Sequence, residues 1–326
     1  MVIDGEKMET KLIKVNENAD LETELAEAGK IIHTGGLVAF PTETVYGLGG
    51  DALNPESSKK IYAAKGRPSD NPLIVHICCI EDLYKITDEV PEAAIKLAEK
   101  FWPGPMTMVL RKNSLVPKET TGGLETVAVR MPSDKIAAAF IKCAGGFVAA
   151  PSANISGKPS PTSAEYVLED MNGRIEMIID GGSSVIGLES TIVDVTQDIP
   201  MILRPGYITG DMVKEVAGNV SYDPAVFGNA SEGIKPKAPG MKYRHYAPKG
   251  DLSIIKGDKA AVVTYIRRAS EEALEKGLKV GVITTTDNAE SYSEAVRVYD
   301  VGLKKDEDSI AHALYGVLRE CDDEKR

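Results

Sequence analysis

The stretch Gly36-Leu-Val-Ala-Phe-Pro-Thr-Glu-Thr-Val-Tyr-Gly-Leu-Gly-Gly50 carries the clearest signal of how this chain folds. Residues 37–40 are apolar and predict a short buried strand, which ends at Pro41 because proline has no amide hydrogen for a strand ladder. Hydrogen-bonding side chains, and glycines that let a backbone turn tightly or approach a ligand, follow at Thr42, Glu43, Thr44, Tyr46, Gly47, Gly49 and Gly50. A connection between a strand and a helix rarely needs so many polar groups, so we interpret this turn as one wall of a ligand site.

Apolar runs and helical spacings alternate on both sides of this turn. The alternation predicts an α/β fold, and the strands that cluster after residue 175 indicate a mixed sheet. Strands are expected at 11–15, 37–40, 73–77, 106–110, 126–130, 147–150, 175–180, 191–195 and 201–203, and helices are expected to begin near Asp20, Glu56, Pro91, Ser133 and Ser163.

The hydrophobic periodicity of the chain weakens from about Asp211. Residues 221–250 hold four prolines and little periodicity, which is typical of a linker or an ordered arm. After them, expected strands at 252–255 and 280–284 and a helix near 310–318 predict a small βαβ-type unit. A chain of 326 residues is long enough for two such domains.

Composition excludes some classes of protein. Hydrophobic residues make up 43% and charged residues 27% of the chain, as in ordinary globular proteins. The net charge of −11 argues against a surface that binds nucleic acid throughout, although a local basic cleft stays open. We find no signal peptide and no apolar run of the roughly 18 residues that cross a membrane, and the four cysteines lack CxxC spacing. A cytoplasmic location and reduced thiols are therefore expected.

One arrangement recurs at the ends of the predicted strands. A strand stops, and hydroxyl, amide or cationic side chains follow at once, at Thr42 and Thr44, Arg130, Ser152 and Asn154, and Arg204; Lys65 and Arg67 stand just before a strand. Ligands of open α/β sheets bind outside the carboxyl ends of strands, so these loops are expected to meet in one crevice. Arginine and lysine side chains there suit a polyphosphate.

Each of these residues also has a structural interpretation. Lys65 and Arg67 are also explained as a solvated helix end, and Arg130 as a surface residue. His76, inside an apolar run, is by default a hydrogen-bonded core histidine. Ser152 to Asn154 also suit a simple turn. Neither a P-loop, a dinucleotide fingerprint nor a familiar nucleophile motif is present, so we expect the substrate to supply the nucleophile while the protein positions it and neutralises charge.

Several ordered motifs resemble one known family. They are Pro41–Gly49, Lys65–Pro68, Asn71–Leu73, Trp102–Thr107, Val129–Pro132, Pro151–Gly157, Leu188–Thr191 and Leu203–Gly206, followed by Ala238–Pro248. Together they are similar to a YrdC-like domain and to the linker of the long-form threonylcarbamoyl-AMP synthases. The resemblance implies a YrdC-like open twisted mixed sheet with flanking helices at 10–217, a linker or lid arm at 218–250, and a small Rossmann-like α/β domain at 251–326. That last domain is expected to be shortened, because the long form usually continues into another strand and a glycine-rich helix.

The resemblance also implies an activity. Members of the family are nucleotidyltransferases that join L-threonine, bicarbonate or CO2 and ATP into L-threonylcarbamoyl-adenylate and release pyrophosphate. The product serves threonylcarbamoyladenosine (t6A) modification of tRNA, which a downstream threonylcarbamoyl transferase complex completes. Two other interpretations were an RNA-binding YrdC-like module and the carbamoyl-transfer domain of a maturation factor. The charge and the 6% aromatic content disfavour the first, and the missing acylphosphatase and zinc segments disfavour the second.

Site residues follow from the resemblance, position by position. The ATP-binding set is Lys65, Arg67, Asn71, Thr126, Ser152, Asn154, Thr162, Arg204 and Tyr246, with Lys65 and Arg67 as the catalytic pair; the L-threonine-binding set is Thr44, His76, Arg130 and Ser190; Tyr243, His245 and Tyr246 form an expected lid. Mg2+ is expected to come with ATP, carried by phosphate oxygens and water rather than by protein side chains. The resemblance leaves direct contact with tRNA open.

Overall fold

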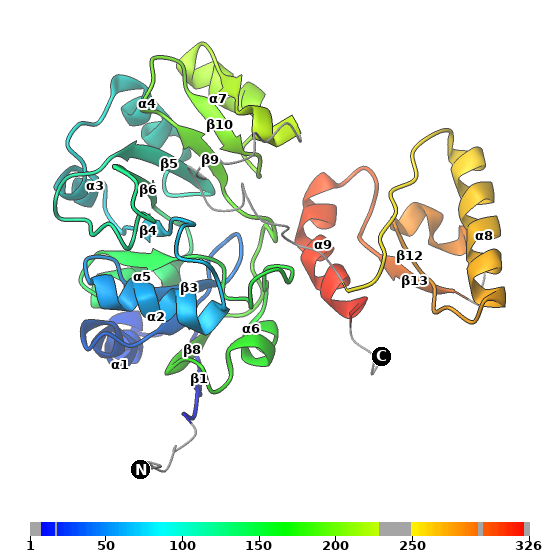
Figure 1. Cartoon of the computed structure of the whole chain (residues 1–326), viewed down its shortest axis with the longest axis horizontal. Helices are drawn as coiled ribbons and strands as arrows, with labels where there is room; N and C mark the ends of the chain where they lie inside the picture. Colours follow the sequence, from blue (N-terminus) through cyan, green and yellow to red (C-terminus); the bar gives the residue numbers. More distant parts are fainter. Residues whose placement is uncertain (1–7, 17, 228–248, 293–295, 323–326) are drawn as a thin grey trace. The chain divides into compact units, whose positions relative to one another are not determined.

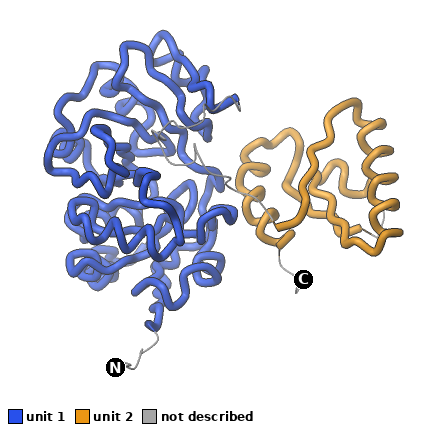
Figure 2. Tube along the Cα trace, in the orientation of Figure 1, with its two compact units in different colours: residues 1–245 blue, residues 246–326 orange. Residues whose placement is uncertain are grey.

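The structure is a computed structural model that describes residues 8–16, 18–227, 249–292 and 296–322. The chain divides into two compact units, residues 1–245 and residues 246–326, which Figure 2 colours blue and orange. Each unit is described here by itself.

The first unit contains one mixed sheet. Among the described residues the sheet has 11 strands, in the order β1-β8-β2-β3-β7-β4-β6-β5-β9-β10-β11, with both parallel and antiparallel neighbours (Figure 1). The α/β class with a twisted mixed sheet is thereby confirmed. The strands are β1 (Lys11–Lys14), β2 (Val38–Phe40), β3 (Gly47–Asp51), β4 (Ile74–His76), β5 (Met106–Arg111), β6 (Thr126–Arg130), β7 (Val148–Ala150), β8 (Met177–Asp180), β9 (Thr191–Asp194), β10 (Met201–Arg204) and β11 (Ser221–Tyr222).

Helices cover the sheet over two large apolar clusters. One cluster joins α1 and α5, which lie side by side, to the sheet through Ile32, Phe140 and Phe40. The other cluster includes Ile61 of α2 and Leu97 of α4. The helices of this unit are α1 (Leu21–His33), α2 (Pro55–Lys65), α3 (Glu81–Ile86), α4 (Glu92–Phe101), α5 (Lys135–Cys143), α6 (Ala164–Met171) and α7 (Gly210–Ala217), with a short 3-10 turn η1 (Pro224–Phe227).

Strand β3 is the main correction to the expected elements. The glycines after Tyr46 were interpreted as part of a turn, but residues 47–51 form a buried strand between β2 and β7. A Cβ on Gly49 would lie 2.9 Å from Val148 Cγ1 and 3.2 Å from the Phe40 ring. The missing side chains thus leave room for Phe40 to lie across β3, and its ring meets His76 edge-on with centroids 5.8 Å apart. Hydrophobic periodicity could not find this strand, because glycine has no side chain to alternate.

Other differences are small or lie in weakly periodic segments. Neither α3 nor α7 was predicted from the sequence. Asp134 rather than Ser133 caps α5, since its carboxylate accepts the Ala137 amide hydrogen at 2.8 Å. Among the described helices, none combines the length and hydropathy needed to cross a membrane.

The second unit has a two-stranded parallel sheet in the residues that the structure describes. Tyr299, Val301 and Val317 form its buried apolar cluster. The strand expected at 252–255 is wrong: these residues form no strand, are largely exposed and have no ladder partner among the described residues. The elements are α8 (Lys259–Glu275), β12 (Gly281–Thr284), the 3-10 helix η2 (Thr286–Ser291), β13 (Arg297–Asp300) and α9 (Glu307–Glu320).

Candidate active site

The turn after β2 is held together by its own hydroxyl groups. Thr42 Oγ1 donates to the Val45 carbonyl at 2.7 Å and accepts the amide hydrogens of Thr44 and Val45 at 3.2 and 3.3 Å. It also lies 2.9 Å from Thr44 Oγ1. Both threonine side chains are buried. The polar residues of this turn are therefore fixed inside the protein rather than solvated on a surface.

The same turn joins two other loops through backbone hydrogen bonds. The amide of Tyr46 donates to the Pro161 carbonyl at 2.9 Å, and the Tyr46 carbonyl accepts from Ala153 at 2.8 Å. On the other side, the Glu43 carbonyl accepts the Ile186 amide hydrogen at 2.7 Å. The turn therefore lies between the 151–162 loop and the 182–190 loop, as expected for the wall of a shared site.

Arg130, at the end of β6, reaches into this turn. Its Nη1 donates to Thr44 Oγ1 at 2.8 Å, and its Nη2 lies 2.8 Å from Glu43 Oε1. All three side chains are buried. The interpretation of Arg130 as a surface residue is thus wrong, and the site contains a buried guanidinium of the kind that binds carboxylates.

Ser190 and Arg204 lie together near the start of β9. Ser190 Oγ is 2.7 Å from Thr107 Oγ1, and Arg204 Nη2 donates to the Ser190 carbonyl at 2.8 Å and to its Oγ at 3.2 Å. Thr107 pairs with Arg130 across β5 and β6. Arg204, predicted to bind ATP, is therefore packed against Ser190, which was predicted to bind threonine.

His76 lies in β4, directly opposite Arg130 in β6. Its imidazole is buried, and its Nδ1 is 3.2 Å from the Ile74 carbonyl. Burial and the nearby positive charge of Arg130 lower the pKa of His76 to about 3, so the ring is neutral at neutral pH. A neutral imidazole beside a guanidinium can donate or accept a hydrogen bond without adding charge.

Lys65 occupies a second part of the site. It ends α2, and Gly66, with φ of 60°, closes the helix in the left-handed conformation that glycine favours. Lys65 Nζ donates to the carbonyls of Ser152 and Asn154, both at 2.5 Å, while Ser152 Oγ donates to Asn154 Oδ1 at 2.5 Å. The structure thus brings together three residues that the sequence assigned to phosphate binding, and Lys65 is not a solvated helix end.

Arg67 and Asn71 lie beside this group. Arg67 Nη2 approaches the carbonyls of Asn71 and Pro72 at 3.5 and 3.4 Å. Tyr62 Oη donates to the Asn71 carbonyl at 3.0 Å, and burial raises the pKa of Tyr62 to about 12, which keeps this donor protonated. The Asn71 amide is fully buried, and neither of its polar atoms has a hydrogen-bond partner among the described residues. A fully buried amide calls for a hydrogen-bonding partner, which a bound ligand or a water molecule can supply.

Other predicted residues lie further out or outside the described chain. Thr126 begins β6 whereas Arg130 ends it, which separates them by about 13 Å along the strand. Thr162 is buried, and its carbonyl accepts the Ser184 amide hydrogen at 2.8 Å. The predicted lid residues Tyr243, His245 and Tyr246 lie outside the described residues.

Two residues of this site were not assigned from the sequence. Glu43 contacts Arg130, and Thr107 contacts Ser190. Glu43 stands between two threonines of the polar turn, so its position was a usable signal. Thr107 lies in an apolar strand, and only the pairing of β5 with β6 reveals its place.

One group of side chains among the described residues has metal-ligand spacing, and it lies just after β4. The ligand atoms of Cys78, Cys79 and Asp82 lie within 4.8 Å of one another. Burial raises the pKa of both thiols, so a metal that bound here would have to displace their protons. Sulfur ligands do not suit Mg2+ in any case.

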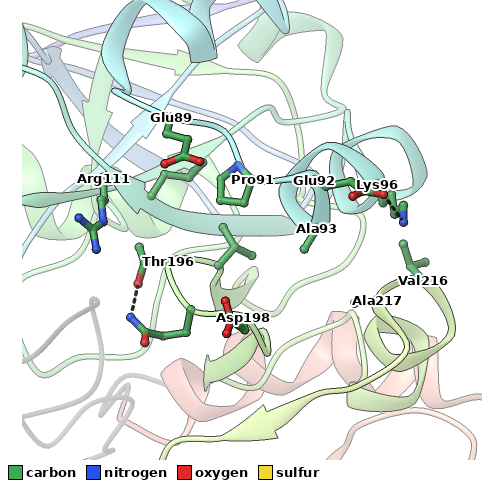
Figure 3. A pocket seen from close by; sticks show the side chains of 13 residues that line it. Glu89, Pro91, Glu92, Ala93, Lys96, Arg111, Thr196, Asp198, Val216 and Ala217 are labelled. Atoms are coloured by element: carbon green, nitrogen blue, oxygen red, sulfur yellow. Dashed lines mark hydrogen bonds and ion pairs between the residues drawn. The ribbon is translucent and has the colours of Figure 1, made fainter.

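A polar cavity of about 600 Å3 lies away from these residues (Figure 3). Leu110, Arg111 and Val195 line it, at the ends of β5 and β9 opposite to Thr107 and Ser190. Glu92 and Lys96, an ion pair at 2.7 Å, stand at its edge. None of the predicted site residues that the structure describes lines this cavity.

The chain matches two known family models. Residues 30–206 match the model of Sua5, YciO and YrdC proteins described as "Telomere recombination", and residues 208–326 match "Threonylcarbamoyl-AMP synthase, C-terminal domain". The chain is 48% identical to the threonylcarbamoyl-AMP synthase of Pyrococcus abyssi over 96% of its own length and 89% of that protein. It is 45% identical to the Bacillus subtilis protein of the same name, over 98% of this chain and 91% of the relative.

Solved structures give the same result. The structure of P. abyssi Sua5 complexed with L-threonine is similar with a TM-score of 0.89 and 46% identity, over 96% of this chain and 89% of that chain. Escherichia coli YciO, at 22% identity and a TM-score of 0.55, covers 61% of this chain and 96% of its own, and it shows the fold alone.

Proposed function

The chain belongs to the threonylcarbamoyl-AMP synthase family, and we propose that it joins L-threonine, bicarbonate and ATP into L-threonylcarbamoyl-adenylate with release of pyrophosphate. The observation that carries the proposal is the buried guanidinium of Arg130 beside the hydroxyl of Thr44, at 2.8 Å, in a chain 46% identical to a protein solved with L-threonine. An amino acid needs such a cation for its carboxylate and such a hydroxyl for orientation.

We assign the threonine side of the site to Thr44, His76, Arg130 and Ser190. Arg130 would hold the carboxylate in a bidentate contact, and Ser190, supported by Thr107, would meet the substrate hydroxyl. Neutral His76 fills the space between Phe40 and Arg130 without repelling the guanidinium. The buried position of all four side chains supports this assignment, because water is kept away from the reacting groups.

We assign the ATP side to the residues around Lys65. Lys65 and Arg67, as the catalytic pair, would neutralise the charge that grows on the leaving pyrophosphate. Asn71 supplies a buried amide with no hydrogen-bond partner among the described residues, which supports its role in binding a ligand. We propose that the other members of this set also bind ATP: Thr126, Ser152, Asn154, Thr162 and Arg204. We propose the same for Tyr246, which also belongs to the expected lid.

The chemistry then needs little more than positioning and charge neutralisation. The amine of threonine captures the carbon of bicarbonate, and an oxygen of the resulting carbamate attacks the α-phosphorus of ATP. Mg2+ suits the phosphate oxygens and water better than it suits the sulfur-rich group at Cys78, so we propose that it enters with the nucleotide. A metal of this kind supplies further neutralisation of the triphosphate charge.

The product would feed t6A formation on tRNA through a partner transferase complex. This downstream step and the use of bicarbonate rest on family membership, and a cytoplasmic location stays a prediction.

Pyrophosphate release, measured with each substrate omitted in turn, tests the proposal. Release should require ATP, L-threonine and bicarbonate together, and EDTA should stop it. When the bicarbonate is radiolabelled, the label should appear in an adenylate that also contains threonine. Release from ATP alone at the full rate would contradict the proposed function.

A further inference from the structure

Glu43 is a buried acidic residue in the candidate site that has no role in the proposed function. Its side chain is only 8% exposed, next to Arg130, and it belongs to the same turn as Thr44. Burying a carboxylate is unfavourable unless hydrogen bonds and a counter-ion replace the lost water. The placement of this charge therefore calls for a physical reason.

The contacts of Glu43 are incomplete among the described residues. Glu43 Oε1 lies 2.8 Å from Arg130 Nη2, close enough for an ion pair. Yet neither carboxylate oxygen, nor Arg130 Nη2, makes an aligned hydrogen bond in the part of the chain that is described. The two charges are therefore close enough to attract each other. The lone pairs of the Glu43 carboxylate still lack aligned hydrogen-bond donors among the described residues.

The substrate brings donors of the right kind. L-threonine carries an ammonium group one carbon away from its carboxylate. If Arg130 holds the carboxylate, the ammonium lies within reach of a group that also touches Arg130. Glu43 is the acidic residue in contact with this guanidinium among the described residues.

The reaction also needs a proton acceptor. An ammonium nitrogen has no lone pair, so it cannot attack carbon until it loses a proton. Nearby alternatives are poor bases: burial raises the pKa of the Tyr46 phenol, and the buried His76 imidazole is a very weak base. Two other acidic side chains already accept hydrogen bonds from the protein: Glu189 accepts one from the Ser160 hydroxyl, and Asp134 accepts the amide hydrogen that caps α5.

We propose that Glu43 binds the ammonium of L-threonine and accepts its proton, which makes it a catalytic base of the reaction. This inference rests on the proposed function. Glu43 takes one proton from the ammonium and becomes a neutral carboxylic acid, leaving a free amine. The amine nitrogen forms a bond to the carbon of bicarbonate, the C–OH bond breaks, and the second nitrogen proton leaves with that hydroxide as water. Glu43 later returns its proton to solvent.

The substitution Glu43→Gln tests the proposal, since it keeps the shape of the side chain and removes the charge. General base catalysis contributes about 100-fold to 10,000-fold, so turnover at saturating threonine should fall by a factor in that range. The remaining rate should rise tenfold per pH unit, because only free amine reacts, whereas the parent enzyme should reach a plateau at lower pH. Among the described residues, the charged group in contact with Glu43 is Arg130, and the imidazole of His76, opposite Arg130 in the sheet, is neutral.

A purely structural role gives a different result. If Glu43 only positions Arg130, then Glu43→Gln should weaken threonine binding, measured by calorimetry, and leave the turnover and pH profile at saturation unchanged; that outcome overturns the proposal. The matched control is Glu176→Gln, because Glu176 accepts the Leu37 amide hydrogen at 2.7 Å and a glutamine oxygen can do the same. Failure of the proposed function itself is separate: the parent enzyme would then show no release of pyrophosphate that depends on threonine and bicarbonate.

Discussion

Arg130 Nη1 donates a hydrogen bond of 2.8 Å to Thr44 Oγ1, although the two residues are 86 positions apart in the chain. This contact ties the end of β6 to the turn after β2 inside the protein. It therefore fixes two of the groups that we assign to the amino acid substrate before that substrate arrives, which lowers the cost of ordering them on binding.

Removal of the Thr44 hydroxyl should weaken threonine binding. Thr44→Val keeps the shape of the side chain but leaves the Arg130 donor without its acceptor, and hydrogen bonds to charged groups contribute about 1.5–3 kcal/mol. We expect KM for L-threonine to rise by roughly tenfold to a hundredfold while KM for ATP stays the same. Thr44→Ser should keep near-parent values. Thr34→Val, at an exposed hydroxyl, is the control.

Loss of the Lys65 ammonium should affect both chemistry and stability. Lys65→Ala leaves the carbonyls of Ser152 and Asn154 without this donor, at a cost of about 1–3 kcal/mol each. We expect turnover to be abolished and Tm to fall. The control Lys59→Ala removes an exposed lysine that pairs with Glu56. Pyrophosphate release at the parent rate by the Lys65 variant would contradict the phosphate assignment.

The charge state of His76 should make stability depend on pH. Its pKa is lowered to about 3 in the folded protein from about 6.5 when exposed, so the unfolded chain binds more protons between these values. The contribution of neutral His76 to the free energy of unfolding is fully present above pH 6.5 and is lost as the pH falls toward 3. Urea unfolding at several pH values should therefore show a smaller acid loss in His76→Gln than in the parent. The same slope in both proteins would refute the assignment, and His33→Gln, at an exposed imidazole, should match the parent.

A methyl group on Gly49 should disturb the core under the site. The Cβ of Gly49→Ala would lie 2.9 Å from Val148 Cγ1 and 3.1 Å from the Val38 carbonyl. Overpacking of this kind costs about 1–3 kcal/mol, and it would move Phe40 away from His76. We expect a lower Tm by calorimetry. The control is Gly250→Ala, where a Cβ meets nothing within 4 Å, and it should leave Tm unchanged. Equal Tm values for the two variants would show that β3 can accept a methyl group without overpacking.

Elements with strong side-chain patterns were predictable. The strands near Thr126–Arg130 and the helix with Leu25 and Ile32 follow from apolar spacing that the structure reproduces. Strand β3 and the absence of a strand at 252–255 were not predictable, because glycine gives no side-chain pattern and a short apolar run gives an ambiguous one. In both cases neighbouring strands, or their absence, decide the structure.

The sequence by itself determined the family, the α/β class and the residue types of the site, because these depend on motifs and spacings within short segments. Only the tertiary structure decided which of those residues meet. Arg204 lies against Ser190, and Lys65 binds the backbone of the 152–154 loop. Glu43 lies beside Arg130, and Phe40 reaches His76 over β3 and β7, the two strands between them in the sheet. The physical reason is that hydrogen bonds and ion pairs act over a few ångströms in space, whereas these partners stand 14 to 89 residues apart in the chain.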